Sequence, residues 1–410
     1  MSTPTFDLEF VRSQFPAFAE PSLHGWAFFE NAGGSYPARQ TVERLTDFYT
    51  RLKVQPYAPY PASIEGGSLM DSARTRMADL LCVAPPEVMF GPSTTANVFV
   101  LAKAFRESMA EGDAIIISDQ NHEANTGAWA RMAETGIDVR MWAADPETGL
   151  LDLAELDRLL DDRVSLVAVP HCSNIVAALN DIPAIAAKAQ AVGAACVVDG
   201  VSHAPHGMPN VAELGCDIYL FSAYKTYGPH QGVMIVRNDW AQRLPSQAHY
   251  FNEGYAGKRL TPAGPDHAQE AAMNGVADYF DALHAHHFPA SADVGARVKN
   301  AQLYELVRAQ EKRVLAPLLD YVRGRNDVRL LGPADPEVRV PTVAIACERP
   351  GADIAADLAA HKVMAGGGDF YSLRLVEKMG AAQGVLRLSF VHYTSPEEVE
   401  QVIRAMDAVL

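Results

Sequence analysis

A regular alternation of apolar runs and amphipathic stretches, starting at residue 88, is the feature that most constrains how this chain can fold. The runs have strand character, and the stretches between them carry helical periodicity. Strands are expected at 88–91, 114–118, 138–142, 164–170, 195–199, 218–221 and 233–236, and helices between them at 95–105, 129–134, 153–160 and 182–191. Continuously apolar strands joined by helices predict a largely parallel sheet that is covered on both faces.

The regular alternation of strands and helices ends at about residue 270. Helices are expected at 270–284, 294–322, 353–361 and 396–410, and strands at 328–331, 343–347 and 385–390. Before residue 88, the patterns predict helices at 7–15, 40–52 and 67–81 and a strand at 26–29. We therefore expect a large α/β domain over residues 20–287 and a smaller α+β domain formed by residues 1–19 and 288–410.

Charge and cysteine content narrow the class of protein. The formal net charge is −16, which argues against nucleic acid or an anionic membrane as a partner. The five cysteines are scattered without a CxxC pair, as in reduced cytoplasmic proteins. No apolar run reaches the length of a membrane span, and the N-terminus lacks the pattern of a signal peptide, so a cytoplasmic protein is expected.

Lys225 follows the apolar run 218–221 and precedes a Tyr-Gly-Pro turn. Open α/β sheets bind ligands at the carboxyl ends of their strands, which is where this amine is expected. A partly desolvated lysine has a lowered pKa and can form a Schiff base with a carbonyl. An ordinary surface lysine is the alternative interpretation of this segment alone.

Three more polar segments follow expected strands. Gly91-Pro92-Ser93-Thr94-Thr95 opens a helix and is typical either of a phosphate cradle or of simple helix capping. His122 is suited to stacking on a flat cofactor or to moving protons, or it is a loop histidine without a catalytic role. Asn174 offers an amide to a ligand or forms an Asx turn.

Asp199 ends the apolar run 195–199, and a buried carboxylate there is costly without a positive partner. The protonated nitrogen of a pyridine ring is such a partner, and its protonation makes the ring an electron sink. Asp199 and Lys225 on neighbouring strand ends are suited to hold opposite edges of one ring. Together with a phosphate cradle, they indicate pyridoxal 5′-phosphate (PLP).

These motifs, in this order, resemble the class V aminotransferase family of PLP enzymes, fold type I, on the cysteine desulfurase and selenocysteine lyase branch. The resemblance extends from Phe28-Phe29-Glu30-Asn31-Ala32 to the final helix. It implies a large domain with a mostly parallel, seven-stranded type of sheet and a smaller C-terminal α+β domain. It also implies that Lys225 binds the cofactor aldehyde, that Asp199 pairs with the ring nitrogen and that His122 stacks on the ring.

The same resemblance suggests roles for further residues. Val201 would pack on the other ring face, Asn174 would reach the ring hydroxyl or the substrate carboxylate, and Ser202 stands where many relatives carry Gln or His. Thr94, Thr95, Ser222 and Tyr224 would hold the phosphate, Asn31 would line the substrate pocket, and Arg387 would bind the substrate α-carboxylate. His267 matches a loop that reaches the phosphate in the partner subunit, which implies a homodimer.

One departure concerns the loop at 363–372, where cysteine desulfurases carry the thiol that accepts sulfur. This loop has no cysteine, and either Asp369 or Tyr371 takes the thiol's position, depending on the alignment. Its arginine is replaced by Met364, and Arg374 is the candidate to compensate for that loss. A persulfide-forming desulfurase is therefore disfavoured.

A histidine cluster, His284, His286 and His287, suggests a metal site, but no cysteine or carboxylate completes it and no metal is expected.

The expected function is PLP-dependent chemistry on a small amino acid, through an external aldimine and a quinonoid. Transamination and β-elimination of the C–S lyase type rank first, with little between them. An amino-acid epimerase is the third outcome. A non-catalytic PLP-fold sensor is the alternative outside enzymes, and the presence of Lys225 argues against it because binding alone does not need a Schiff-base lysine.

Overall fold

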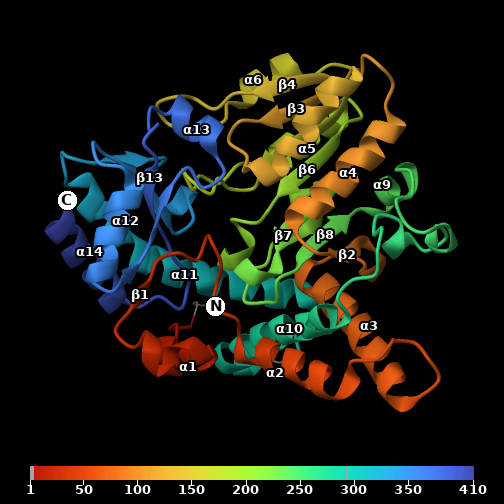
Figure 1. Ribbon diagram of the computed structural model, residues 1–410, viewed down its shortest axis with the longest axis horizontal. Helices are drawn as coiled ribbons and strands as arrows, with labels where there is room; N and C mark the ends of the chain where they lie inside the picture. Colours follow the sequence, from red (N-terminus) through yellow and green to blue (C-terminus); the bar gives the residue numbers. More distant parts are fainter. Residues whose placement is uncertain (1–3, 292) are drawn as a thin grey trace.

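A seven-stranded sheet forms the centre of the larger part of the computed structural model, which describes residues 4–291 and 293–410 (Figure 1). Its strand order is β2-β8-β7-β6-β5-β3-β4. The strands are β2 (Val88–Gly91), β3 (Ala114–Ser118), β4 (Asp138–Trp142), β5 (Val164–Pro170), β6 (Ala195–Asp199), β7 (Ile218–Ser222) and β8 (Gly232–Val236). Only β8 runs against its neighbours. The mostly parallel sheet expected from the alternating pattern is confirmed.

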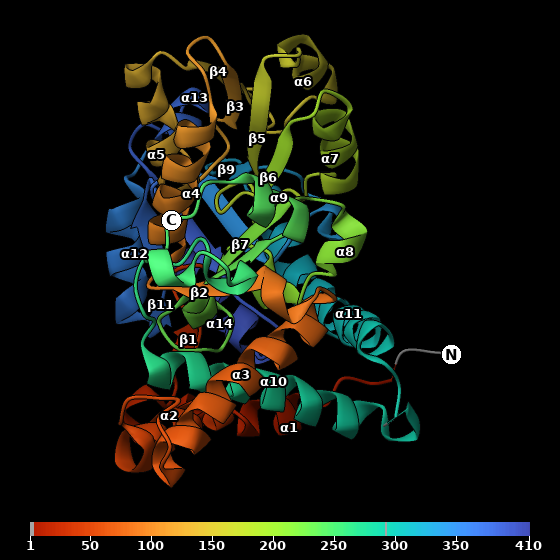
Figure 2. The same cartoon turned by 90° about the vertical axis from the view of Figure 1, so that its right-hand side faces the viewer.

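Both faces of this sheet are buried over its other strands, because alternate residues of those strands enter different apolar cores, while the edge strand β4 is largely exposed. Ile116 packs in a core with helices α3 (Pro61–Leu81), α7 (Ile182–Ala191) and α10 (His267–His287). Its neighbours Ile115 and Ile117 pack on the opposite face with α4 (Thr94–Ser108) and α5 (Gly127–Ala130). Figure 2 shows α3 and α10 crossing beneath the sheet, next to α2 (Arg39–Asp47). Two-sided burial is the physical reason why these strands are continuously apolar.

A second, four-stranded sheet organises the C-terminal part, in the order β12-β13-β10-β9. Its strands are antiparallel: β9 (Arg329–Leu331), β10 (Thr342–Ala346), β12 (Gly366–Gly368) and β13 (Val385–Ser389). Helices α11 (Ala296–Arg323), α12 (Gly351–Ala360) and α14 (Pro396–Val409) bury its apolar face. The remaining helices are α1 (Leu8–Ser13), α2 (Arg39–Asp47), α6 (Leu153–Leu159), α8 (Val211–Leu214), α9 (Asn238–Arg243) and α13 (Leu373–Lys378).

Two N-terminal segments pack differently from the expected division of the chain. Strand β1 (Ala27–Phe28) pairs in parallel with β11 (Val363–Met364), so it joins the C-terminal part and not the large sheet. Helix α1 packs against the end of α10, where the rings of Phe10 and His286 stack at 3.7 Å between centroids. The boundary near Phe288 stays a prediction, but the chain crosses between the two parts more often than the sequence pattern indicated.

Every helix within residues 4–291 and 293–410 is too short or too polar to span a bilayer.

Candidate active site

A cavity of about 890 Å³ lies at the carboxyl edge of the large sheet, where the C-terminal part meets it. Eleven residues expected from the sequence line it: Thr94, Thr95, His122, Asn174, Asp199, Val201, Ser202, Ser222, Tyr224, Lys225 and Arg387. They converge because β3, β5, β6 and β7 are parallel and end at the same edge. Strand β2 also ends there, since it is antiparallel to β8, which itself opposes β7.

Lys225 closes a short 3₁₀ turn, Ala223–Lys225, directly after β7. Its carbonyl accepts a hydrogen bond from the Ser35 hydroxyl (2.6 Å), which fixes the turn against the N-terminal segment. Burial and the nearby Arg387 charge lower the Lys225 pKa to about 8, although Asp199 and Glu30 oppose the shift. A substantial fraction of this amine is therefore neutral near physiological pH and able to attack a carbonyl.

Asp199 is the last residue of β6 and is only 5% exposed. Its Oδ1 accepts the backbone N–H of Val201 at 2.9 Å. Burial raises the Asp199 pKa, against the opposing effects of that hydrogen bond and of Lys225. A carboxylate in this position gains most from a cationic partner in the cavity, which fits a protonated pyridine nitrogen.

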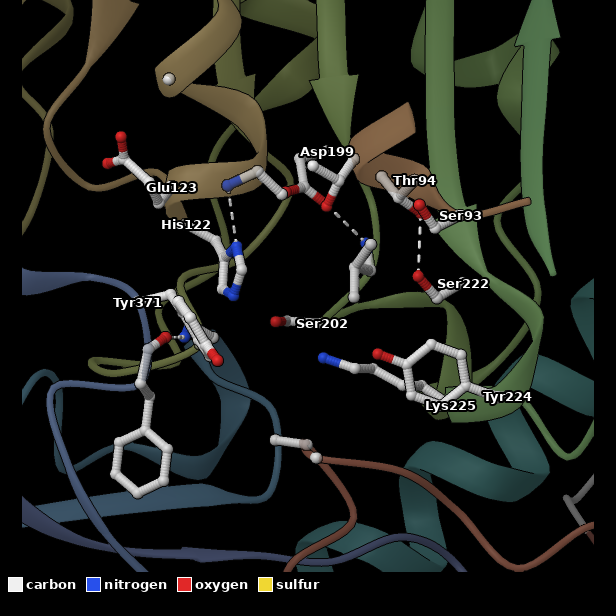
Figure 3. A pocket seen from close by; sticks show the side chains of 18 of the residues that line it. Ser93, Thr94, His122, Glu123, Asp199, Ser202, Ser222, Tyr224, Lys225 and Tyr371 are labelled. Atoms are coloured by element: carbon white, nitrogen blue, oxygen red, sulfur yellow. Dashed lines mark hydrogen bonds between the residues drawn. The ribbon is translucent and has the colours of Figure 1, made fainter. Parts of the chain in front are cut away.

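The N-terminus of α4 forms a polar cradle beside Lys225. Ser93 caps the helix by accepting the N–H of Ala96, and the hydroxyls of Thr94 and Ser222 lie 2.8 Å apart (Figure 3). Within the described residues, the N–H groups of Thr94 and Thr95 have no hydrogen-bond partner. A Cβ at Gly232 would lie 2.4 Å from the Ser93 carbonyl carbon, so glycine is required there. Two free N–H groups and two hydroxyls at a helix N-terminus fit a phosphate.

His122 lies over the cavity at the start of a 3₁₀ turn, and its Nδ1 accepts the N–H of Ala124 at 3.0 Å (Figure 3). Burial, Lys225 and Arg387 lower the His122 pKa to about 4. The ring is therefore neutral at physiological pH, and because Nδ1 is an acceptor, Nε2 carries the proton. A neutral, flat ring in this place is suited to stacking on a cofactor.

Arg387 projects from β13, between β10 and β12. Its Nη2 donates to Oε1 of Glu30 at 2.6 Å, and its Cζ lies 3.7 Å from the centroid of the Phe370 ring. The Arg387 side chain is 4% exposed, and that of Glu30 is 28% exposed. The guanidinium expected to bind a substrate carboxylate thus already holds a carboxylate of its own chain.

Asn174 also has partners within the protein. Its Nδ2 donates to the carbonyl of Phe370 at 3.0 Å, and its Oδ1 accepts the Ser372 hydroxyl at 2.8 Å. The amide expected to contact a ligand therefore joins the end of β5 to the loop before α13.

Two expected site residues do not line the cavity. Asn31 is 3% exposed and bonds to the Tyr393 hydroxyl and the Ser389 carbonyl, because the chain turns it toward the C-terminal core. It borders only a small enclosed cavity of about 10 Å³ behind Lys225. A direct substrate contact by Asn31 does not agree with this packing. His267 begins α10 outside the cavity lining, and its role in a partner subunit stays a prediction.

The C-terminal histidines of α10 have protein partners. His284 Nε2 lies 2.8 Å from Gln302 Oε1, His286 Nε2 lies 2.9 Å from Asp7 Oδ2, and His287 Nε2 accepts the Asp7 N–H. In the part of the chain that the structure describes, no three His, Cys, Asp or Glu side chains gather as a metal site.

Among the cavity-lining residues that sequence patterns missed are Glu30, His230 and Phe370. Glu30 stands in the motif Phe28-Phe29-Glu30-Asn31-Ala32, but its partner Arg387 lies 357 positions away in the sequence. His230 stacks on Tyr224 with ring centroids 4.6 Å apart, and its position just after the Tyr-Gly-Pro turn was the available signal. Phe370 depends on a loop conformation that residue spacing does not encode.

The family model described as "Aminotransferase class-V" matches residues 27–402 of this chain. The chain belongs to the class V aminotransferase family. It is similar along its whole length to "Aminotransferase-like protein FGM3" of Gibberella zeae, with 32% identity over 424 aligned residues and 100% of both chains covered. It is also 26% identical to a "Cysteine desulfurase" of Pectobacterium carotovorum, with 99% of this chain and 98% of the relative covered.

A solved structure with a similar fold is the apo cysteine desulfurase of Thermococcus onnurineus. The TM-score is 0.84 at 22% identity, with 100% of this chain and 98% of the other covered. The family and the PLP fold type I predicted from the sequence are confirmed. Class V aminotransferases use pyridoxal 5′-phosphate, and the cradle, the buried Asp199 and the lowered pKa of Lys225 fit that cofactor.

Proposed function

We propose that this class V aminotransferase-family protein is an enzyme that removes the Cα proton of a small amino acid, with Lys225 as the base. The lowered pKa of Lys225 in a cavity shared with Asp199 carries the proposal. A lysine with a pKa of about 8 is neutral often enough to accept a proton and acidic enough to return it.

The surrounding residues would position the reactants. Thr94, Thr95 and Ser222 would hold the cofactor phosphate, Asp199 its ring nitrogen and His122 its ring face. Bound there, PLP would supply an electron sink for the bond broken at Cα. Arg387 would take the substrate carboxylate after displacing Glu30, so that the Cα–H bond faces Lys225.

Transamination and β-elimination both begin with this proton transfer, and both remain candidates. In transamination, Lys225 would pass the proton to the cofactor, and the amino group would remain on the cofactor when the keto acid leaves. In β-elimination, the same loss would be followed by departure of a substituent from Cβ. Epimerisation would require a second acid on the face of Cα opposite Lys225.

Sulfur transfer through a protein persulfide is disfavoured in this proposal. No cysteine is among the described residues that line the cavity. Cys172, which follows β5, is 2% exposed, and burial raises the pKa of its thiol. A thiol in this state is a poor nucleophile.

The test is a panel of L-amino acids incubated with PLP-reconstituted protein in D₂O. Exchange of the Cα hydrogen, followed by NMR, would support the proposal, and its loss in Lys225→Ala would assign the base. Ammonia and a keto acid in equal amounts identify elimination. A single turnover that a second keto acid restarts identifies transamination, and racemised amino acid identifies epimerisation. Absence of Cα exchange with every amino acid would contradict the proposal.

We also propose that the protein acts as a homodimer in which His267 of each chain approaches the other chain's phosphate cradle. Large apolar side chains on nearby segments, such as Tyr57 and Tyr255, are more than half exposed, as expected of a surface that a second copy covers. Loss of PLP affinity in His267→Ala, with the dimer intact by light scattering, would support this arrangement. Unchanged affinity would contradict it.

A further inference from the structure

The loop between β12 and α13 contains two consecutive residues in the left-handed backbone region. Phe370 has φ +51° and Tyr371 has φ +58°. This region disfavours side chains with a Cβ, and aromatic residues rarely adopt it. Such conformations persist where neighbouring contacts enforce them, and they gather at functional sites.

Hydrogen bonds enforce this conformation from both ends. The Asn174 side chain donates to the Phe370 carbonyl at 3.0 Å, and the Glu123 N–H donates to the Tyr371 carbonyl at 2.7 Å. Within the loop, the Tyr371 N–H donates to Oδ1 of Asp369 at 2.7 Å. Asn174 follows β5 and Glu123 follows β3, so these hydrogen bonds connect the strained turn to the carboxyl edge of the large sheet.

The strained turn directs two aromatic rings at the cavity. The Phe370 ring covers the Arg387 guanidinium, and the Tyr371 ring lies 5.3 Å from that of His122, inclined by 41°. Figure 3 shows Tyr371 below His122, with its hydroxyl pointing into the cavity and Lys225 entering from the other side of the view. The turn therefore fixes the place of a phenol opposite the proposed base.

The surroundings of Tyr371 do not indicate a packing role. The residue is 72% exposed, and in the described part of the chain its hydroxyl forms no hydrogen bond with protein. A tyrosine that stabilises a fold buries its ring or bonds its hydroxyl to a partner. Here the backbone is strained, yet the phenol remains available to a ligand.

We propose that Tyr371 is a catalytic residue that exchanges a proton with the side chain of the amino-acid substrate. The assignment rests on the proposed function: with the carboxylate on Arg387 and Cα at Lys225, the substrate side chain is the part left to face Tyr371. As the bond from Cβ to its substituent breaks, the substituent keeps the electron pair, takes the phenol proton and leaves neutral. Solvent then returns a proton to the exposed phenolate.

The test uses L-alanine and PLP-reconstituted protein in D₂O, with Tyr371→Phe as the variant and Tyr321→Phe as its matched control. Tyr321 bonds Asp407 on the surface and does not line the cavity. When the Cα proton moves to the cofactor and Cα becomes an imine carbon, the methyl hydrogens turn acidic, so alanine reports transfer at Cα and at Cβ in one NMR spectrum. General acid–base catalysis contributes about 10²–10⁴-fold. We expect Cβ exchange to fall at least about a hundredfold in Tyr371→Phe while Cα exchange stays within about twofold.

The two exchange sites separate the possible failures. If the wild type exchanges neither hydrogen of alanine, nor the Cα hydrogen of any other amino acid in the panel, the proposed function itself fails. If Cα exchanges and Cβ does not, or if Tyr371→Phe slows both equally, the role of Tyr371 at the side chain is wrong.

A second measurement does not depend on turnover. In protein labelled with 3-fluorotyrosine, the ¹⁹F signal that disappears in Tyr371→Phe belongs to residue 371. It should shift when L-alanine is added to the PLP-loaded protein, while the Tyr321 signal stays in place. An unmoved residue 371 signal would overturn the proposal.

Discussion

Replacing Glu30 by Gln should tighten binding of the amino-acid carboxylate, because Glu30 occupies the guanidinium that the substrate needs. The 2.6 Å bond from Arg387 to Glu30 has to be broken or shared when a substrate binds. Charge-assisted hydrogen bonds contribute about 1.5–3 kcal/mol. Since 28% of the Glu30 side chain is exposed, the lower end applies. About 1.5 kcal/mol corresponds to roughly tenfold in affinity.

The assay is the KM for L-alanine in the Cα-exchange reaction, and Glu30→Gln should lower it about tenfold. The variant should also be less stable by about 2 kcal/mol, since a buried arginine loses its charged partner, which lowers Tm by about 2 °C in a chain of this size. The matched control is Glu123→Gln, because Glu123 also lines the cavity but pairs with Arg374 at the surface. Its KM should stay within about twofold. An unchanged or higher KM in Glu30→Gln would refute the competition between Glu30 and the substrate.

Three further results follow from the site. The rate of PLP attachment, measured by stopped-flow absorbance, should rise about tenfold per pH unit and level off near pH 8, because only the neutral amine attacks and the Lys225 pKa is about 8. With an ordinary lysine, the attachment rate would keep rising to about pH 10. Asp199→Asn should weaken PLP binding by at least about tenfold in an equilibrium titration, since a charged hydrogen bond becomes neutral, and equal affinity would argue against its pairing with the ring nitrogen. Gly366→Ala should lower the free energy of unfolding, measured in urea, by about 1–3 kcal/mol, because the added Cβ would lie 2.5 Å from Glu30 Oε2. The control Gly264→Ala should have no effect, because a Cβ at Gly264 would have no atom within 4 Å.

Sequence patterns predicted the sheet and most of the cavity because both depend on the composition of each strand and on the residues that directly follow it. Continuously apolar strands report burial on two faces, and the polar residues that follow them must gather where parallel strands end. Asp199 and Lys225 could therefore be placed together without knowledge of any contact between them. The same reasoning located the cradle at Thr94, since its helix begins directly after β2.

Long-range pairings could not be predicted in this way. Nothing local to Glu30 indicates Arg387, and nothing local to β1 indicates β11, because both pairings depend on how the C-terminal part docks. The partners of Asn31 could not be predicted for the same reason: its amide bonds to Tyr393 and Ser389 in the C-terminal core. The conformation of Tyr371 is enforced by Asn174 and Glu123, which lie far from it in the sequence.

Among the lysines of this chain, we expect Lys225 to be the residue that binds the cofactor. Reduction of the PLP-reconstituted protein with borohydride would fix the cofactor to the lysine that holds it, and peptide mass spectrometry would identify that lysine. We predict one modified residue, Lys225, with modification prevented when the protein is saturated with an amino acid that displaces the lysine. Modification of a different lysine, or none in protein that has bound PLP, would contradict the account.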